Sequence, residues 1–72
     1  MSNILVCKEV IKNDKGKVEK IVVISETGDS RVAGINDLEE LIDYGFLVIS
    51  KDGYELIVEE NNAGVKELVK LV

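Results

Sequence analysis

Apolar side chains gather in short runs along the chain, and polar turns that contain glycine separate these runs. The apolar run at 4–13 is rich in β-branched residues, and an Asp-Lys-Gly turn joins it to a second run at 18–25. β-Branched residues favour strands, and glycine supplies the positive φ that tight turns need. The pattern therefore predicts a hairpin over residues 4–25. A second turn at 27–29 leads to a short third strand at 30–33.

One amphipathic segment, residues 37–44, predicts a helix. Its apolar positions recur at helical spacing: Leu38, Leu41 and Ile42. Asn36 is the expected N-cap, and Glu39 lies three residues further on, as in a capping box. Gly45 is the expected left-handed residue after the helix, and we expect Phe46 to pack back on the helix.

Two apolar segments follow the helix, and a third ends the chain. Residues 46–50 and 54–60, joined by a Lys-Asp-Gly turn, predict a second hairpin. The tail at 65–72 fits one face of a helix and also a returning strand, and helix is slightly favoured. The fold class expected is α+β: a small, mainly antiparallel sheet of four or five strands, one packed helix (37–44), and a C-terminal helix or strand.

Two of the predicted strands are apolar without alternation, at residues 21–24 and 46–49. A strand that is apolar on both sides requires cover on both sides. One short helix shields only part of one sheet face. The other face must be covered by the C-terminal segment, by a second copy of the chain, or by a partner protein.

Composition limits the class of protein. The 72 residues suffice for one domain, 1–72, and such a short chain has a thin margin of stability. An apolar fraction of 46% with 32% charged residues is typical of a globular domain. We expect a cytoplasmic protein without a membrane segment, because no long apolar stretch and no export signal is present. The net charge of −5 argues against direct binding of nucleic acid.

Catalytic chemistry finds little support in the sequence. Gly28-Asp29-Ser30 resembles the way one group of serine hydrolases presents its nucleophile, but the chain has no histidine to serve as the base. We interpret it as a polar turn. Cys7 lies in an apolar strand and is expected to be a small core residue. No cofactor fingerprint and no zinc spacing is present, so we expect no enzyme, no cofactor and no metal.

Two features remain as candidate binding residues. Arg31 is the only arginine, on a predicted surface segment, and could contact a carboxylate or phosphate. Tyr44, Phe46 and Tyr54 are the only aromatic residues, and such side chains contribute strongly to protein interfaces. They are the candidate partner-binding residues.

The order of these segments resembles a family of small, uncharacterised bacterial and phage domains. The matching parts are Lys12 with "NDKGKV" (13–18), "DLEELIDYG" (37–45) and "AGVKELVK" (63–70). The resemblance covers nearly the whole chain and departs at the tail, where the family more often has an aromatic residue and a basic-polar ending. It implies the same arrangement of strands and helix, and it implies no activity.

The leading functional hypothesis is a non-enzymatic interaction module of bacterial or phage origin, either self-associating as a homodimer or acting as an accessory subunit of a larger complex. One alternative is an inhibitor that mimics nucleic acid, and a second is a binder of a small anion, such as a nucleotide or organic acid, through Arg31. The mimic would present six acidic residues to a basic groove: Asp37, Glu39, Glu40, Asp43, Glu55 and Glu59.

Overall fold

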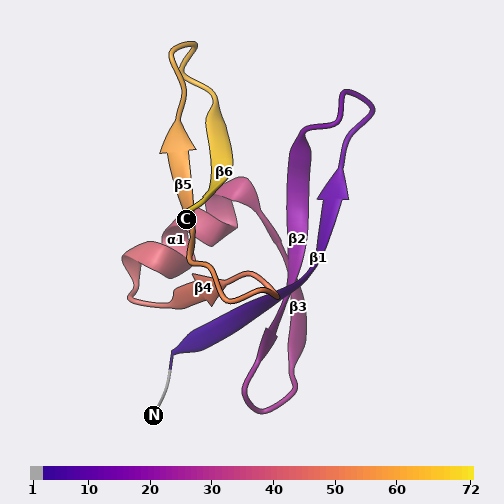
Figure 1. The fold of residues 1–72 in the computed structure, drawn as a ribbon, viewed down its shortest axis with the longest axis vertical. Helices are drawn as coiled ribbons and strands as arrows, with labels where there is room; N and C mark the ends of the chain where they lie inside the picture. The colour runs from indigo at the N-terminus through magenta and orange to yellow at the C-terminus, as the bar shows by residue number, and fades with distance from the viewer. Residues whose placement is uncertain (1–2) are drawn as a thin grey trace.

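A computed structural model describes residues 3–72 and has six strands and one helix, an α+β fold as expected (Figure 1). The elements are, in chain order, β1 (Ile4–Lys12), β2 (Val18–Ser25), β3 (Ser30–Gly34), α1 (Ile35–Asp43), β4 (Leu47–Ile49), β5 (Leu56–Glu60) and β6 (Lys66–Lys70). The predicted hairpin over 4–25 and the short third strand are both confirmed.

Four strands form one sheet, in the order β3-β2-β1-β4. The pairs β1–β2 and β2–β3 are antiparallel, whereas β4 runs parallel to β1. Strands β5 and β6 form a separate antiparallel pair. The β1–β2 and β5–β6 hairpins extend toward the same end of the molecule as two arms, and the helix lies on the β5–β6 side (Figure 1).

The predicted second hairpin over residues 46–60 is confirmed only in part: its two strands and its turn are present, but β4 and β5 belong to different sheets. Strand β4 ends at Ile49, and only an isolated bridge joins Ile49 to Glu55 across the turn. Instead of β4, the C-terminal tail pairs with β5. The tail forms β6, which pairs with β5 at five consecutive positions, from Leu56↔Lys70 to Glu60↔Lys66. The slight preference for a C-terminal helix is therefore wrong, and the alternative of a returning strand is confirmed.

The helix begins earlier than its polar residues indicate. Gly34, with φ −73° and ψ 174°, is the N-cap, and no side chain caps the first turn. The prediction of Asn36 as N-cap is wrong, because β3 runs directly into the helix and places Asn36 inside the first turn. The predicted end is confirmed: Gly45 has φ +104°, and the Phe46 amide donates to the Leu41 carbonyl at 3.0 Å.

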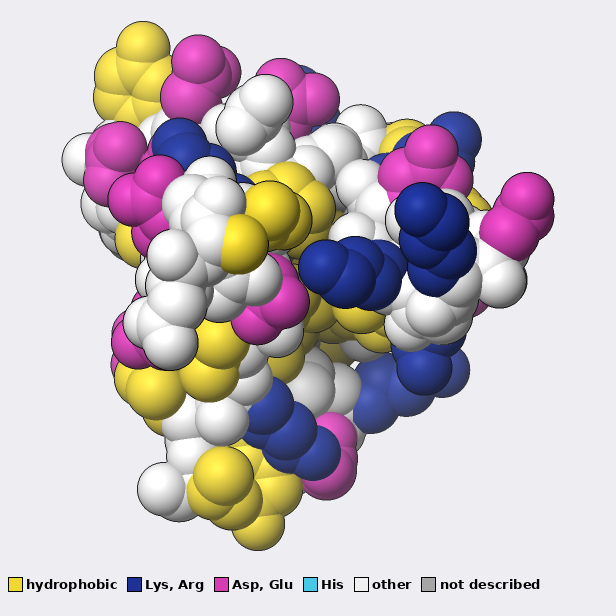
Figure 2. All heavy atoms as spheres, turned by 90° about the horizontal axis from the view of Figure 1, so that it is seen from above, with side chains coloured by type: hydrophobic (Ala, Val, Ile, Leu, Met, Phe, Trp, Pro, Cys, Tyr) yellow, Lys and Arg dark blue, Asp and Glu magenta, His cyan; other side chains and the backbone are white. Residues whose placement is uncertain are grey.

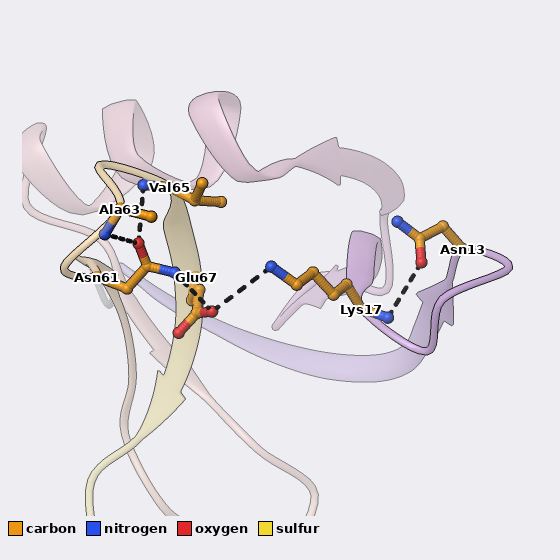
Figure 3. Close-up of polar contacts among 6 residues, drawn as sticks. All are labelled: Asn13, Lys17, Asn61, Ala63, Val65 and Glu67. Atoms are coloured by element: carbon orange, nitrogen blue, oxygen red, sulfur yellow. Dashed lines mark hydrogen bonds and ion pairs between the residues drawn. The ribbon is translucent and has the colours of Figure 1, made fainter.

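All four tight turns between strands share one construction, which the sequence analysis missed. Each begins with Asn or Ser and has a glycine of positive φ three residues later: Asn13/Gly16, Ser25/Gly28, Ser50/Gly53 and Asn61/Gly64. The side-chain oxygen of the first residue accepts a hydrogen bond from the amide of the fifth, at 3.0–3.3 Å. Figure 3 shows this bond for Asn13 and Asn61. Such three-residue loops with a glycine bulge close antiparallel hairpins.

The core lies between the four-stranded sheet and a layer made by α1 and the β5–β6 hairpin. Its buried side chains form one cluster: Leu5, Cys7, Ile21, Val23, Leu38, Val48 and Leu56. Leu38 comes from the helix and Leu56 from β5, so both elements cover the same face of the sheet. This face, which carries Cys7 and Val23, is called the inner face below. Each buried aliphatic side chain contributes about 1.5–3 kcal/mol to folding.

Candidate protein-interaction surface

The opposite face of the four-stranded sheet is apolar, and no element of residues 3–72 packs over it as α1 does over the inner face. Side chains alternate between faces along a strand, so the neighbours of the buried residues point to this second side. The strand register brings them together as one surface, the outer face, made of Ile4, Val6, Val22, Ile24, Val32, Leu47 and Ile49.

The outer face is continuous across all four strands. Ile24, Val6 and Ile49 form one row over β2, β1 and β4, because Val6 is paired with both of the others. Beside this row, Val22 is paired with Val32 on β3. The exposed fractions are 58% for Val32, 38% for Leu47 and 36% for Val6. The C-terminal segment, which the sequence allows as a cover for this face, packs on the inner face instead. A second copy of the chain and a partner protein remain as possible covers.

Two opposite charges lie on the same side as the outer face. Glu9 is paired with Val22, and Lys20 lies two positions before Val22 on the same strand. Glu9 takes this side because a β-bulge between Cys7 and Glu9 inserts Lys8 as an extra residue. Without the bulge, alternation from Cys7 would have placed Glu9 in the core. Within residues 3–72 neither charge forms an ion pair.

The structure separates the three aromatic residues. Tyr44 is 81% exposed at the end of α1. Phe46 is half-buried and packs against the core cluster. Tyr54 lies in the Ser50–Tyr54 turn with the Lys70 ammonium 4.7 Å from its ring centre, a cation–π contact. Neither Tyr44 nor Phe46 shares a hollow with Tyr54.

Arg31 lies on the edge strand β3 between two surface hollows. One hollow, of about 420 Å³, also contains Asp37, Glu40 and Tyr44. The other contains Asp29 and Phe46. Arg31 forms no ion pair with any described residue, although three carboxylates line its hollows. Those carboxylates repel an anion, so the surroundings of Arg31 do not favour the binding of a phosphate or an organic acid.

A groove of about 490 Å³ opens on the inner side, where β1 passes the Ser50–Tyr54 turn and β6. Its apolar lining consists of Cys7, Val10, Leu56 and Leu68. Three lysines border it: Lys8, Lys51 and Lys70. Lys70 is held at 2.5 Å from a carboxylate oxygen of Asp52, and this hydrogen bond lowers the pKa of Asp52. No local pattern in the sequence predicts this groove, because it depends on the pairing of β5 with β6 instead of with β4.

The two potential nucleophiles lie in different surroundings. Burial raises the pKa of the Cys7 thiol, which outweighs the opposite effects of its hydrogen bond to the Glu9 carbonyl and of the Lys51 charge. A neutral buried thiol is a poor nucleophile. Ser30 begins β3 and is exposed, after a turn in which Gly28 has φ +90°. Gly28-Asp29-Ser30 is therefore the end of a turn and the start of a strand.

Charge is distributed unevenly between the β1–β2 hairpin and the rest of the chain. The β1–β2 hairpin carries five lysines against three acidic residues, whereas the rest of the chain carries four basic and eleven acidic residues. Seen from above, lysines and arginine are more numerous on one side of the molecule, where some acidic side chains also lie among them (Figure 2). The Lys17 ammonium lies 3.9 Å from a Glu67 carboxylate oxygen and joins the two arms (Figure 3).

The acidic residues considered for a nucleic-acid mimic do not all remain free. Glu39 is bound by Lys66, and this hydrogen bond raises the pKa of Lys66. The other helical acids, Asp37, Glu40 and Asp43, are exposed. Glu55 and Glu59 lie before and within β5. Glu59 is paired with Glu67 of β6, and only its neighbour Glu60 is paired with a basic residue, Lys66.

No family model, curated protein or solved structure matches the chain. The resemblance to a family of small bacterial and phage domains therefore stays a prediction. No helix among residues 3–72 is long and apolar enough to cross a membrane. In the same part of the chain, no group of three or more Cys, Asp or Glu side chains is arranged to hold a metal ion.

Proposed function

We propose that the chain is a non-enzymatic protein-interaction module, of the bacterial or phage type that its sequence resembles, and that it self-associates through the outer face. The observation that carries this proposal is the continuous apolar surface over β3, β2, β1 and β4, with Val32 58% exposed at one side and Leu47 38% exposed at the other. Monomeric proteins rarely leave such a surface in water.

A second copy of the chain fits this surface better than an unlike partner, because the outer face is electrically self-complementary. Glu9 and Lys20 stand on it with opposite charges and without ion-pair partners among residues 3–72. In a two-fold dimer, residue i of one copy meets residue j of the other and the reverse. Each Glu9 can then meet the Lys20 of the other copy, so two ion pairs flank the apolar centre.

The size of the outer face is near the lower limit for a small dimer. Four strands spaced about 4.8 Å apart, with about five residues of 3.3 Å in each of β1, β2 and β3 and three residues in β4, make a face of roughly 300 Å² in projection. The uneven surface of the side chains adds to this projected area. The accessible area of the face therefore approaches the roughly 500 Å² per partner that the smallest stable interfaces bury. That area is a tenth of the 5094 Å² surface of one chain. Two such sheets would pack face to face as a sandwich.

The test uses matched charged substitutions on and off the outer face. Val32→Glu and Leu47→Glu each place a carboxylate in the proposed interface. Val65→Glu makes the same change at a valine that is 44% exposed in the β5–β6 turn. We expect light scattering to give a dimer mass for the unmodified chain and for Val65→Glu, and a monomer mass for the two outer-face variants.

Circular dichroism of every variant would establish that the monomers remain folded. If Val65→Glu dissociates the dimer and Val32→Glu does not, the outer face is not the interface. An association that weakens steeply with salt would also contradict the proposal, because apolar burial depends little on ionic strength and exposed ion pairs contribute little.

A further inference from the structure

The second half of β1 has an open edge. Strand β4 pairs with β1 only from Ile4 to Val6, because the chain leaves the sheet at the Ser50–Tyr54 turn. β1 itself continues to Lys12. Among residues 3–72, no strand pairs with residues 7–12 on the side that β4 occupies lower down. The main-chain groups on this side are available to another strand.

The open edge lies beside the 490 Å³ groove, whose lining includes Lys8, Glu9 and Val10 of β1. Leu68 and Lys70 of β6 also line it. The lining is apolar. The groove begins one residue beyond Val6, the last residue of β1 that pairs with β4. An added strand would therefore continue the position of β4 and would place every second side chain over Leu56 and Leu68.

Three lysines and two acidic residues, Glu9 and Asp52, line the groove, so its border carries a net positive charge in a chain whose net charge is −5. Lys8 and Lys51 form no ion pair within residues 3–72, and Lys70 is neutralised by Asp52. Further along the same edge, Lys12 at the end of β1 adds a positive charge.

We infer that the groove binds an extended acidic segment of a partner protein, which adds to β1 as a parallel or antiparallel strand. Main-chain hydrogen bonds to residues 8–12 would supply affinity, apolar side chains would contact Leu56 and Leu68, and acidic side chains would meet Lys8 and Lys51. This is peptide recognition by strand addition. Apart from Glu9, which also stands on the outer face, the residues that line the groove do not belong to the outer face, so the site is open in a dimer as well as in a monomer.

Two labelled peptides of ten residues would test the charge preference by fluorescence anisotropy, one alternating glutamate with valine and one alternating lysine with valine. We expect saturable binding of the acidic peptide only. Lys51→Glu, which places a carboxylate on the groove, should weaken that binding at least about tenfold. Lys15→Glu, at the β1–β2 turn outside the groove, should change it less than about twofold.

Two further forms of the acidic peptide would test strand addition itself. Methylation of alternate peptide nitrogens removes the donors along one edge of an extended peptide and leaves those along the other edge. We expect one of the two methylation patterns to abolish binding and the other to preserve it. In the complex, the amide protons on the open edge of residues 8–12 should become protected from exchange with solvent.

Equal binding of the acidic and basic peptides, equal effects of the two methylation patterns, or no binding at all would overturn the inference. So would a groove that takes decanoate, a simple amphipathic anion, and excludes the peptide. Light scattering of the peptide-bound protein keeps this test separate from self-association, because a failure of either result leaves the other unchanged.

Discussion

At the scale of single residues, Gly45 holds the end of α1 in a conformation that other residues rarely adopt. Its φ of +104° allows the Phe46 amide to reach the Leu41 carbonyl. Gly45→Ala should lower the free energy of unfolding by about 1–2 kcal/mol, because a Cβ is strained at positive φ even where space is open. Each kcal/mol corresponds to about 4–8 °C in the midpoint of thermal unfolding.

The matched control is Gly34→Ser at the other end of the helix. Gly34 has a negative φ, and a Cβ there would meet only a carboxylate oxygen of Asp37 at 3.9 Å. The serine hydroxyl could cap the first turn, which no side chain now caps. We expect no loss of stability from this substitution. Equal losses at the two glycines would contradict the assignment of strain to Gly45.

Cys7 should make stability depend on pH on the alkaline side. Burial raises the pKa of its thiol, so the unfolded chain releases the thiol proton at a lower pH than the folded chain. The stability from the buried neutral thiol is complete below the unfolded pKa and is lost as pH rises through the folded pKa. The free energy of unfolding should therefore fall as the pH rises above about 8.5, the ordinary pKa of a free thiol.

Cys7→Ala removes the titrating group and should flatten this part of the pH profile, whatever it does to stability at neutral pH. The measurement is denaturant unfolding of both proteins at several pH values. The comparison cancels the contributions that the two proteins share. Parallel profiles for the two proteins would show that Cys7 is not responsible.

At the scale of elements, Asn61 is the side chain that shapes the β5–β6 hairpin. Its side-chain oxygen accepts hydrogen bonds from the amides of Ala63 and Val65 at 2.9 and 3.0 Å, and its amide group donates to Glu67 (Figure 3). Asn61→Ala should cost about 1 kcal/mol. Hydrogen exchange should show the loss most strongly in the amides of β6.

Asn62→Ala, one residue further along the same turn, is the comparison for this experiment. The Asn62 side chain is exposed and makes no hydrogen bond with residues 3–72. We expect a change within about 0.5 kcal/mol. If the two substitutions act alike, the hydrogen bonds of Asn61 do not set the stability of the hairpin.

The sequence predicts local elements well and their distant partners poorly. The first hairpin and the end of α1 follow from signals within a few residues, such as Gly16 in its turn and Gly45 after the helix. The parallel pairing of β4 with β1 joins segments some forty residues apart, and no local pattern encodes it. The tail was ambiguous because Leu68 and Val69 suit a helix or a strand, and its pairing with β5 decides between them.

At the scale of the whole molecule, the need for cover on a second sheet face was predictable from the continuous apolar runs at 21–24 and 46–49. The composition of that face was not predictable, because it depends on register. The bulge at Lys8 moves Glu9 to the outer face, and only the paired strands bring Val32 and Leu47 onto the same surface. Arg31 stands out in the sequence because it is the only arginine, but only the folded chain brings carboxylates beside it.

Sedimentation equilibrium of the unmodified chain tests self-association through the outer face most directly. Over micromolar to millimolar concentration, the apparent mass should rise to twice the 7.9 kDa of one chain and stop there. The Val32→Glu chain should remain at the mass of one chain throughout. A mass of 7.9 kDa for the unmodified chain at the highest concentration would contradict the proposal.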